Sequence, residues 1–231
     1  MIKKIIYNPW PLGKLKKKYE RPEILIIKKR GYKFKDPREI VDIFEKKVAL
    51  YAGSKYAVSV DCCSHGIFLV LKYLNLKKTI TIPKRTYVSV PMQILHAGYK
   101  VKFKDISWTG AYQLAPLPVW DFATRWKRNM FNGEFNICSF QLKKRIPIGR
   151  GGMILTNSLK AYKKLKLMRY DGRDLEKNYM KNKYKFLGWH YYMTPEDAAR
   201  GMILFDDIKH NQEDTGGHNN YSDLSKYKIF K

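Results

Sequence analysis

Three short groups of residues in this chain carry side chains that could bind or transform a ligand. The first is Cys62-Cys63-Ser64, where small and hydroxyl-bearing residues open an expected helix. A helix N-terminus of this kind can bind a phosphate group. The second is Asp121, a single carboxylate among aromatic and small neighbours. The third is Lys143-Lys144-Arg145, in which a lysine removed from water would have a lowered pKa and could act as a Schiff-base nucleophile.

Each group also has a plainer explanation, which the residues alone leave open. Ser64 can be an ordinary helix cap, Asp121 can cap the turn that follows it, and three consecutive cations often form a solvated patch. What distinguishes the three groups is their position, because each follows an expected buried strand. In open α/β sheets, ligands bind outside the carboxyl ends of the strands.

Short apolar strands alternate with amphipathic helices along most of the chain. Strands are expected at 56–60, 79–82, 99–103, 117–120, 135–140 and 153–156. Helices are expected at 37–53, 64–75, 88–97, 158–169 and 195–209, the first capped by Asp36 and ended by Gly53, the second capped by Ser64. This alternation predicts an α/β fold with a mainly parallel sheet and flanking helices.

Three regions follow from this reading of the chain. Residues 1–36 are basic and interrupted by Pro and Gly, which predicts an arm with little regular structure. Residues 37–209 form the α/β domain, with a loop at 107–116. Residues 210–231 are rich in Asn, Asp, Gly and Ser, which predicts a polar tail that frays.

The three chemical groups together fit one cofactor, pyridoxal 5′-phosphate. The end of the helix would hold its phosphate, and the lysine would form the Schiff base. A buried Asp121 would keep the pyridine nitrogen protonated, so that the ring withdraws electrons.

Composition limits the class of protein. Of the 231 residues, 45% are hydrophobic, which excludes global disorder. There are 46 Lys and Arg against 20 Asp and Glu, and the formal net charge of +26 predicts anionic partners: phosphorylated small molecules, acidic lipid or nucleic acid. The cations are spread along the chain without clustered Arg or a known motif, so nucleic acid is disfavoured as a partner, and no membrane partner is expected.

The location expected from the sequence is the cytoplasm. There is no run of 18 apolar residues, so no membrane span is predicted, and the N-terminus lacks the apolar core of a signal peptide. The three cysteines are an odd number and two of them are adjacent. This spacing predicts reduced thiols and neither a disulfide nor a metal site.

Several segments resemble the DegT-type, pyridoxal-phosphate-dependent nucleotide-sugar aminotransferases, which have the fold type I architecture. The resemblance covers roughly residues 37–205 in the family's order. It is carried by FEKKVALYAGSKYAVSVDCCSHGIFLVLKYL (44–74), IPKRTYVSVPMQILHAGYKVKFKDI (82–106), PVWDFAT (118–124), SFQLKKRIPIGRGGMILTN (139–157), MRYDGR (168–173) and GWHYYMTPEDAARG (188–201).

The resemblance assigns roles to individual positions. The family's spacing of Ser, Lys and Gly-x-Gly-Gly selects Lys144 rather than Lys143 as the Schiff-base residue, and Ser139 as a hydroxyl near the phosphate. Asp121 matches the carboxylate at the pyridine nitrogen and Tyr87 the aromatic that stacks on the ring. The small pair at the phosphate corresponds to Cys63 and Ser64.

The chain also departs from the family pattern. Thr124 stands where the family has a Gln that supports the ring hydroxyl, and Arg150 stands where an acidic residue is usual between the glycines. His190 stands where an Asn reaches the phosphate of the partner subunit. The family normally continues into a small C-terminal domain, which is largely missing here.

The function expected from these observations is amino transfer, from glutamate or another amino acid to a keto-sugar attached to a nucleotide, by a homodimer. Candidate clamps for an anionic substrate are Arg125, Lys127, Arg128 and Arg150. One alternative is an inactive protein of the same fold that binds pyridoxal phosphate or a nucleotide sugar. The other is a basic nucleic-acid-binding protein.

Overall fold

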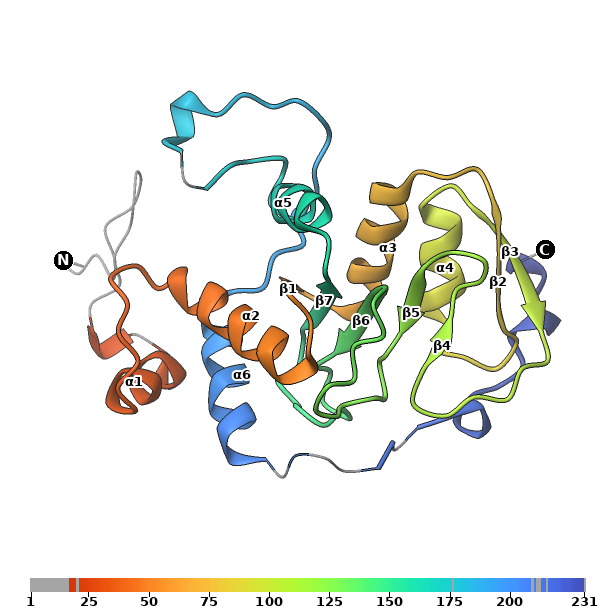
Figure 1. Cartoon of the computed structure of the whole chain (residues 1–231), viewed down its shortest axis with the longest axis horizontal. Coiled ribbons are helices and arrows are strands. Elements are labelled where there is room, and N and C mark those ends of the chain that lie inside the picture. Colours follow the sequence, from red (N-terminus) through yellow and green to blue (C-terminus); the bar gives the residue numbers. More distant parts are fainter. Residues whose placement is uncertain are drawn as a thin grey trace, which may run out of the picture.

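The computed structural model describes residues 17–19, 21–175, 177–208, 210, 213–214 and 216–230 (Figure 1). Within these ranges the α-helices are α1 (Pro22–Lys29), α2 (Glu39–Ala52), α3 (Cys63–Leu74), α4 (Ser89–His96), α5 (Leu159–Met168) and α6 (Pro195–Asp207). None of these helices combines the length and the apolar composition needed to cross a membrane. Short 3-10 helices lie at η1 (Lys17–Tyr19), η2 (Tyr179–Lys181), η3 (His218–Asn220), η4 (Leu224–Lys226) and η5 (Lys228–Phe230).

The strands form a mixed sheet. They are β1 (Tyr56–Val60), β2 (Thr79–Pro83), β3 (Lys100–Lys104), β4 (Tyr112–Gln113), β5 (Val119–Asp121), β6 (Phe135–Ser139) and β7 (Gly152–Thr156). Five of them pair in the order β1-β7-β6-β5-β4, and β2 pairs with β3. A bridge between Thr81 of β2 and Ala115, with hydrogen bonds of 2.7 and 3.1 Å, connects the two groups.

The expected α/β fold with flanking helices is confirmed, but its sheet is mixed rather than mainly parallel. Among the described strands, the β5–β6 and β2–β3 pairs are parallel, whereas β1–β7, β6–β7 and β4–β5 are antiparallel. Parallel neighbours need a crossover of about a dozen residues or more, usually with a helix. Residues 114–118 alone join β4 to β5, and residues 140–151 between β6 and β7 form a loop without a helix. The first connection is too short for a crossover and the second lacks the crossover helix, and both return the chain in the opposite direction.

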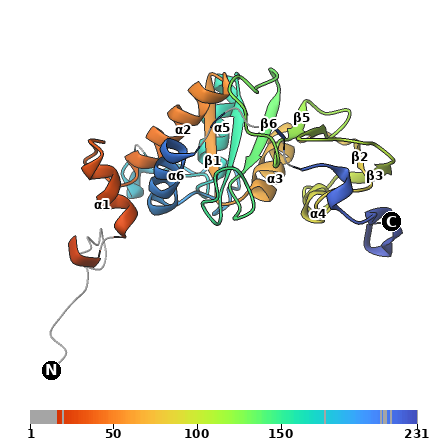
Figure 2. The ribbon, with the colours of Figure 1, turned by 90° about the horizontal axis from the view of Figure 1, so that it is seen from below.

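Helices cover both faces of the sheet and create two cores. Alternate strand residues point to opposite faces, as the two-residue period of a strand requires. In β1, Val58 and Val60 pack with α3, α4 and α5, whereas Ala57 packs with α1, α2 and α6. In β7, Ile154 belongs to the first core and Leu155 to the second. Figures 1 and 2 show α1, α2 and α6 grouped together on the side of the sheet where β1 lies.

Capping differs from the expectation at two helices. α3 begins at Cys63, and its N-cap is Cys62 rather than Ser64, because the Cys62 sulfur accepts the His65 N–H at 3.5 Å. α2 begins at Glu39 rather than at residue 37, and Asp36 accepts the N–H of Arg38 in the turn before it. The C-terminal end of α2 at Gly53 is confirmed, with Gly53 in the left-handed region at φ 82°.

The two ends of the described chain are more ordered than expected. The basic arm contains α1, because Ile24 and Ile27 are buried in the core that α2 and α6 share; residues 1–16 of this arm lie outside the described residues. The expected fraying tail contains three 3-10 helices, with Leu224 and Phe230 buried. The average polarity of each segment predicts little regular structure. The few apolar residues in it nevertheless order the segment, because they are buried against distant parts of the folded chain.

A buried ionic cluster ties α2, β1 and the end of α5 together. Glu45 accepts hydrogen bonds from the Ser59 N–H at 2.8 Å and the Ser59 hydroxyl at 2.9 Å, and it pairs with Lys166 and Arg169. Arg169 also donates to the Ser59 hydroxyl at 2.8 Å. Burial by itself raises the pKa of Glu45, but the charges of Arg169 and Lys166 outweigh it and lower that pKa. The cluster therefore holds β1 in place behind the residues that follow it.

Candidate active site

The carboxyl ends of β1, β5 and β6 meet at one edge of the sheet. β1 and β6 both run antiparallel to β7, and β5 runs parallel to β6, so all three strands point the same way. A cavity of about 700 Å³ lies at this edge. Its lining contains seven of the residues assigned from the sequence: Cys63, Ser64, Tyr87, Asp121, Thr124, Ser139 and Lys144. The polar groups that follow these strands are thus brought together as expected.

The N-terminus of α3 forms one wall of the cavity. The Ser64 hydroxyl lies 2.6 Å from the hydroxyl of Ser89, the first residue of α4, so two helix N-termini meet there. A Cβ at Gly152 would lie only 2.6 Å from the Cys63 nitrogen, so glycine is needed where β7 passes behind this helix. The Cys63 thiol donates to the Ile137 carbonyl at 3.7 Å. The backbone N–H groups of the first turn, rather than this thiol, are therefore the donors suited to an anion.

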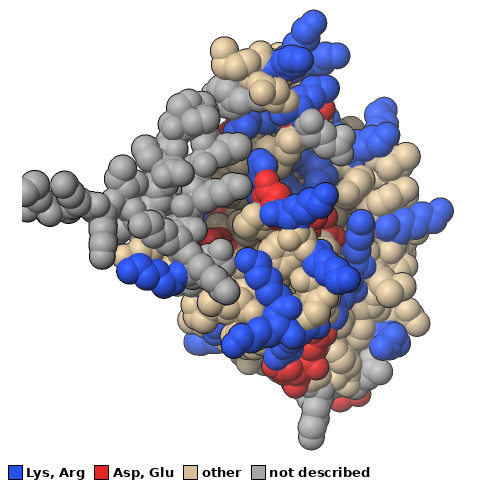
Figure 3. Space-filling model, turned by 90° about the vertical axis from the view of Figure 1, so that its left-hand side faces the viewer, with Lys and Arg blue, Asp and Glu red and all other residues tan. Residues whose placement is uncertain are grey.

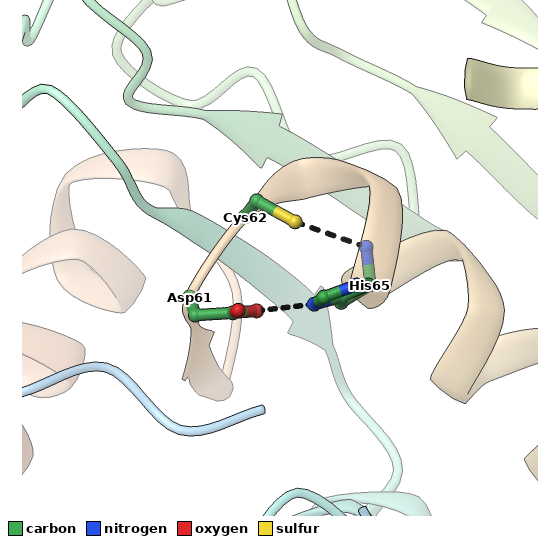
Figure 4. A group of neighbouring side chains, drawn as sticks. All are labelled: Asp61, Cys62 and His65. Carbon is green, nitrogen blue, oxygen red and sulfur yellow. Dashed lines mark hydrogen bonds and ion pairs between the residues drawn. The ribbon is translucent and has the colours of Figure 1, made fainter. Parts of the chain in front are cut away.

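Asp61, Cys62 and His65 form a second polar group at the same end of α3 (Figure 4). His65 Nδ1 lies 2.7 Å from Asp61 Oδ1, and Arg150 donates to Asp61 Oδ2 at 2.7 Å. The His65 ring stacks on Tyr191 with 3.6 Å between centroids. Burial by itself lowers the pKa of His65, but the hydrogen bonds with Asp61 and Cys62 raise it to about 9. The imidazole is therefore protonated at neutral pH.

The same three side chains have the composition of a metal site. One ligand atom from each lies within 4.8 Å of the others, and carboxylate, thiolate and imidazole are all zinc ligands. The spacing of the cysteines predicts no metal site. The sequence feature that could have indicated this grouping is the pattern Asp-Cys-x-x-His, which places a histidine one helical turn after an aspartate. Here Asp61 binds the His65 ring and Arg150, and the Cys62 sulfur accepts the backbone N–H of His65.

Asp121 is a buried carboxylate at the end of β5. It is 5% exposed, and its two oxygens accept the Ala123 N–H at 2.8 Å and the Tyr112 hydroxyl at 2.9 Å. Burial raises the pKa of Asp121; the two hydrogen bonds and the charge of Lys144 lower it but do not fully offset the burial. A cation bound against this carboxylate would therefore be stabilised.

Lys144 belongs to the loop between β6 and β7. Ile146 and Ile148 are buried and anchor the loop in the core beneath the cavity. Lys143 and Lys144 both line the cavity, but Lys144 is half-buried whereas Lys143 is exposed. Lys144 is also the cation whose charge acts on Asp121. This arrangement supports Lys144 over Lys143 as the reactive amine.

The remaining lining residues assigned from the sequence differ in what they can offer. Tyr87 precedes α4 and is 58% exposed, so its ring is accessible for stacking. Thr124 Oγ1 lies within hydrogen-bond distance of the carbonyl oxygens of Gly110, at 3.0 Å, and Gly216, at 3.2 Å. Because a hydroxyl has a single proton, Thr124 is already committed as a donor within the chain. Ser139 ends β6 at the mouth of the Lys144 loop.

His190 lies outside the lining of this cavity. Its side chain is 65% exposed, and Nδ1 lies 2.7 Å from Asp171 Oδ2. The ring also packs edge-on against Tyr192, with 4.7 Å between centroids. The role expected for His190 concerns a second subunit, so the single chain leaves it as a prediction.

The candidate clamps for an anion are separated by the structure. Arg125 and Arg150 line the cavity, but Arg125 pairs with Asp214 at 2.8 Å, and Arg150 with the carboxylate at the start of α3. Lys127 and Arg128 are not among the lining residues in the described part of the chain. Sequence position alone could not distinguish these cations.

The C-terminal segment contributes lining residues that the sequence did not indicate. Gly216, Asn220 and Tyr221 all face the cavity. The sequence offers only one indication of a packed role, which is the presence of Tyr221, Leu224 and Phe230 in an otherwise polar stretch.

Solved structures of other proteins, one of them a sugar aminotransferase, share this fold. The sugar aminotransferase CalS13 from Micromonospora echinospora superposes with a TM-score of 0.66 at 15% identity, and AtS13 from Actinomadura melliaura with a TM-score of 0.69 at 18% identity. Each superposition covers 80% of this chain and 64% of the other chain.

Sequence comparison defines the family. The chain matches the model of the DegT/DnrJ/EryC1/StrS aminotransferase family over residues 29–118 and 127–216, and it belongs to that family. It is 35% identical over 92 residues to the spore coat polysaccharide biosynthesis protein SpsC of Bacillus subtilis (strain 168), covering 38% of this chain and 23% of that protein. It is 26% identical over 213 residues to the uncharacterized protein MJ1066 of Methanocaldococcus jannaschii, covering 69% of this chain and 55% of that protein.

The chain thus spans less than two thirds of the length of these relatives. Aminotransferases of this family use pyridoxal 5′-phosphate, which confirms the cofactor predicted from the sequence. The cavity fits that group, because it combines a buried and incompletely compensated carboxylate, Asp121, with an amine, Lys144, and with two helix N-termini.

Proposed function

We propose that this chain carries the cofactor site of a pyridoxal-phosphate-dependent aminotransferase that moves an amino group from glutamate to a nucleotide-linked keto-sugar. The observation that carries the proposal is the convergence of Asp121, Lys144 and the N-terminus of α3 in one cavity. Membership of the aminotransferase family supports the same reaction.

Each of these groups has a separate task. When bound, the cofactor supplies a ring that withdraws electrons from the carbon bearing the amino group. Asp121 would hold the protonated ring nitrogen by a charge-assisted hydrogen bond. The N–H groups at the start of α3 and the Ser64 and Ser139 hydroxyls would bind the phosphate, with the partial positive charge of the helix end favouring it.

Lys144 would act both as the covalent anchor and as the proton carrier. Lys144 lies on an anchored loop and lines the same cavity as Asp121, so its amine would be held near the reacting carbon. An amine in this position that accepts a proton from one atom of the substrate and donates it to another acts as a general base and then as a general acid. Tyr87, which lines the cavity and is exposed, would offer its ring for stacking on the cofactor.

The substrate and the assembly are further parts of the proposal. An anionic sugar nucleotide suits the net charge of +26 and the lining cations Lys143 and Arg145. We infer that the active unit is a cytoplasmic homodimer in which His190 reaches the phosphate of the opposite subunit. The exposure of His190 and the aromatic residues around it support a contact with another chain.

One observation favours a second candidate, an inactive protein of the same fold that binds the cofactor or a nucleotide sugar. Thr124 and Arg150 depart from the family pattern, and both are engaged within the chain. Nucleic-acid binding has less support. On the face shown in Figure 3, Lys and Arg side chains are interspersed with uncharged and acidic ones rather than forming one continuous patch.

A visible absorption spectrum separates these candidates. The purified chain is mixed with pyridoxal phosphate, and glutamate is then added. We expect a visible band from the lysine-bound cofactor that shifts with glutamate in the wild type and in Lys143→Ala, but is absent in Lys144→Ala. A band that glutamate does not change would support the inactive binder. The absence of any band would contradict the proposed function.

A further inference from the structure

Residues 216–224 form a strap across the cavity, and backbone bonds hold it there. The Gly216 carbonyl accepts the Gly110 N–H at 2.8 Å, and the His218 N–H donates to the Trp108 carbonyl at 3.1 Å. At its far end the Leu224 N–H donates to the Lys84 carbonyl at 2.8 Å, where Leu224 itself is buried. In Figures 1 and 2 this C-terminal part (dark blue) lies beside β2 and β3. The family match ends at residue 216, so nearly all of the strap lies beyond it.

Close contact at a glycine fixes the path of the strap. Gly217 forms a bridge with Thr109, and a Cβ at Gly217 would lie 2.6 Å from the Trp108 carbonyl oxygen. Real Cβ atoms do not approach a backbone oxygen this closely, so a larger residue would push the strap outward. The strap is therefore a wall in a defined position and not a loose end of the chain.

Three aromatic rings contact one another in a row: the buried Trp108, Tyr221 of the strap and the exposed Tyr87. The Tyr221 ring stacks on Trp108, with centroids 5.8 Å apart and an interplanar angle of 21°. On its other side it meets Tyr87 in a T-shaped arrangement, with centroids 6.5 Å apart. Trp108 is 9% exposed, and its indole N–H donates to the Arg85 carbonyl at 2.8 Å. Tyr221 is thus a half-buried ring between a fixed Trp108 and an exposed Tyr87.

We propose that Tyr221 is a positioning residue that holds the Tyr87 ring in place for stacking on the bound cofactor. The inference rests on the proposed function, in which Tyr87 contacts the cofactor. A tyrosine exposed to 58% samples several rotamers, and ordering it on binding weakens affinity. A neighbouring ring in T-shaped contact favours one orientation beforehand. The strap would then contribute to cofactor affinity through Tyr87.

The test measures the dissociation constants of two probes, pyridoxal 5′-phosphate and inorganic phosphate, in the chain and its variants. Tyr221→Ala should weaken pyridoxal phosphate about 3- to 10-fold, the range expected for loss of one aromatic pair, and leave inorganic phosphate unchanged. Tyr221→Phe should bind like the wild type, because only the ring is used. Tyr227→Ala removes an exposed tyrosine that follows the strap and lies outside the cavity lining, and it should have no effect.

A double-mutant cycle distinguishes positioning from direct contact. If Tyr221 acts through Tyr87, then Tyr221→Ala has no further effect on pyridoxal phosphate once Tyr87→Ala is present. Tyr221→Leu, which keeps apolar bulk against Trp108, replaces the alanine variant if that variant does not fold. Additive effects of the two substitutions, or equal weakening of both probes, would overturn the proposal. So would wild-type affinity in both Tyr221→Ala and Tyr221→Leu. A wild type that binds phosphate but not pyridoxal phosphate would instead refute the proposed function.

Discussion

Asp121→Asn tests the reasoning about the site most directly, because the substitution should strengthen the fold and weaken cofactor binding. Asparagine has nearly the same shape, and its amide oxygen can still accept the Ala123 N–H. The Tyr112 hydroxyl can turn its proton toward Thr86, which it already contacts, and accept from the new amide. The variant therefore removes the charge of Asp121 while leaving its hydrogen bonds satisfied.

The effect on cofactor affinity follows from the lost charge. A hydrogen bond to a charged partner contributes about 1.5–3 kcal/mol, which corresponds to a roughly 10- to 150-fold change in affinity. We expect Asp121→Asn to raise the dissociation constant of pyridoxal phosphate within this range, measured by titration of the visible absorbance. Asp105→Asn, at a carboxylate whose side chain is 79% exposed and not part of the cavity lining, is the matched control and should bind normally.

The effect on stability has the opposite sign. Burial raises the pKa of Asp121 in the folded chain, so the folded state favours the neutral carboxyl. Such a group contributes most stability below its unfolded pKa, and this contribution is lost as the pH rises through the raised folded pKa. At neutral pH the ionised Asp121 therefore destabilises the cofactor-free wild type, by about 1.36 kcal/mol for each pH unit by which folding raises its pKa. Asparagine avoids that cost.

Urea unfolding without cofactor, at neutral pH and at a pH below the usual carboxyl range, measures this difference. Asp121→Asn should be more stable than the wild type at neutral pH, and the two should converge in acid. A variant that is less stable at neutral pH would refute the argument that the Asp121 charge is incompletely compensated. An unchanged affinity for pyridoxal phosphate would show that Asp121 only caps the turn after β5.

Three other results are expected. Borohydride reduction with pyridoxal phosphate, followed by peptide mass mapping, should label Lys144; a label on Lys143 would contradict the assignment. Glu45→Gln leaves Arg169 buried without a charged partner and should cost about 3–5 kcal/mol of unfolding free energy in urea; a loss below about 1 kcal/mol would show that the buried cluster contributes little. Inactive Lys144→Ala and inactive His190→Ala chains should recover activity when mixed, because one site of each heterodimer is complete; no recovery despite subunit exchange would exclude a shared site.

Local sequence was sufficient to locate most elements and the core of the site. Strand and helix periods depend on residues within a few positions of one another, and they placed β1, β6 and β7 to within one residue of the structure. Polar residues directly after strands are determined in the same local way. Because β1, β5 and β6 do run in one direction, Asp121, Lys144 and Ser64 reach one cavity.

The remaining features depend on contacts between residues far apart in the chain. Which strands run antiparallel is set by the loops that return the chain, and the period of a strand contains no information on its direction. The raised pKa of Asp121 requires the burial that surrounding elements provide, and no neighbour in sequence determines it. The strap is the clearest case, because it is a polar stretch without periodicity. It is ordered because Tyr221 stacks on Trp108 and the Leu224 N–H donates to the Lys84 carbonyl. Only the tertiary structure brings those partners together.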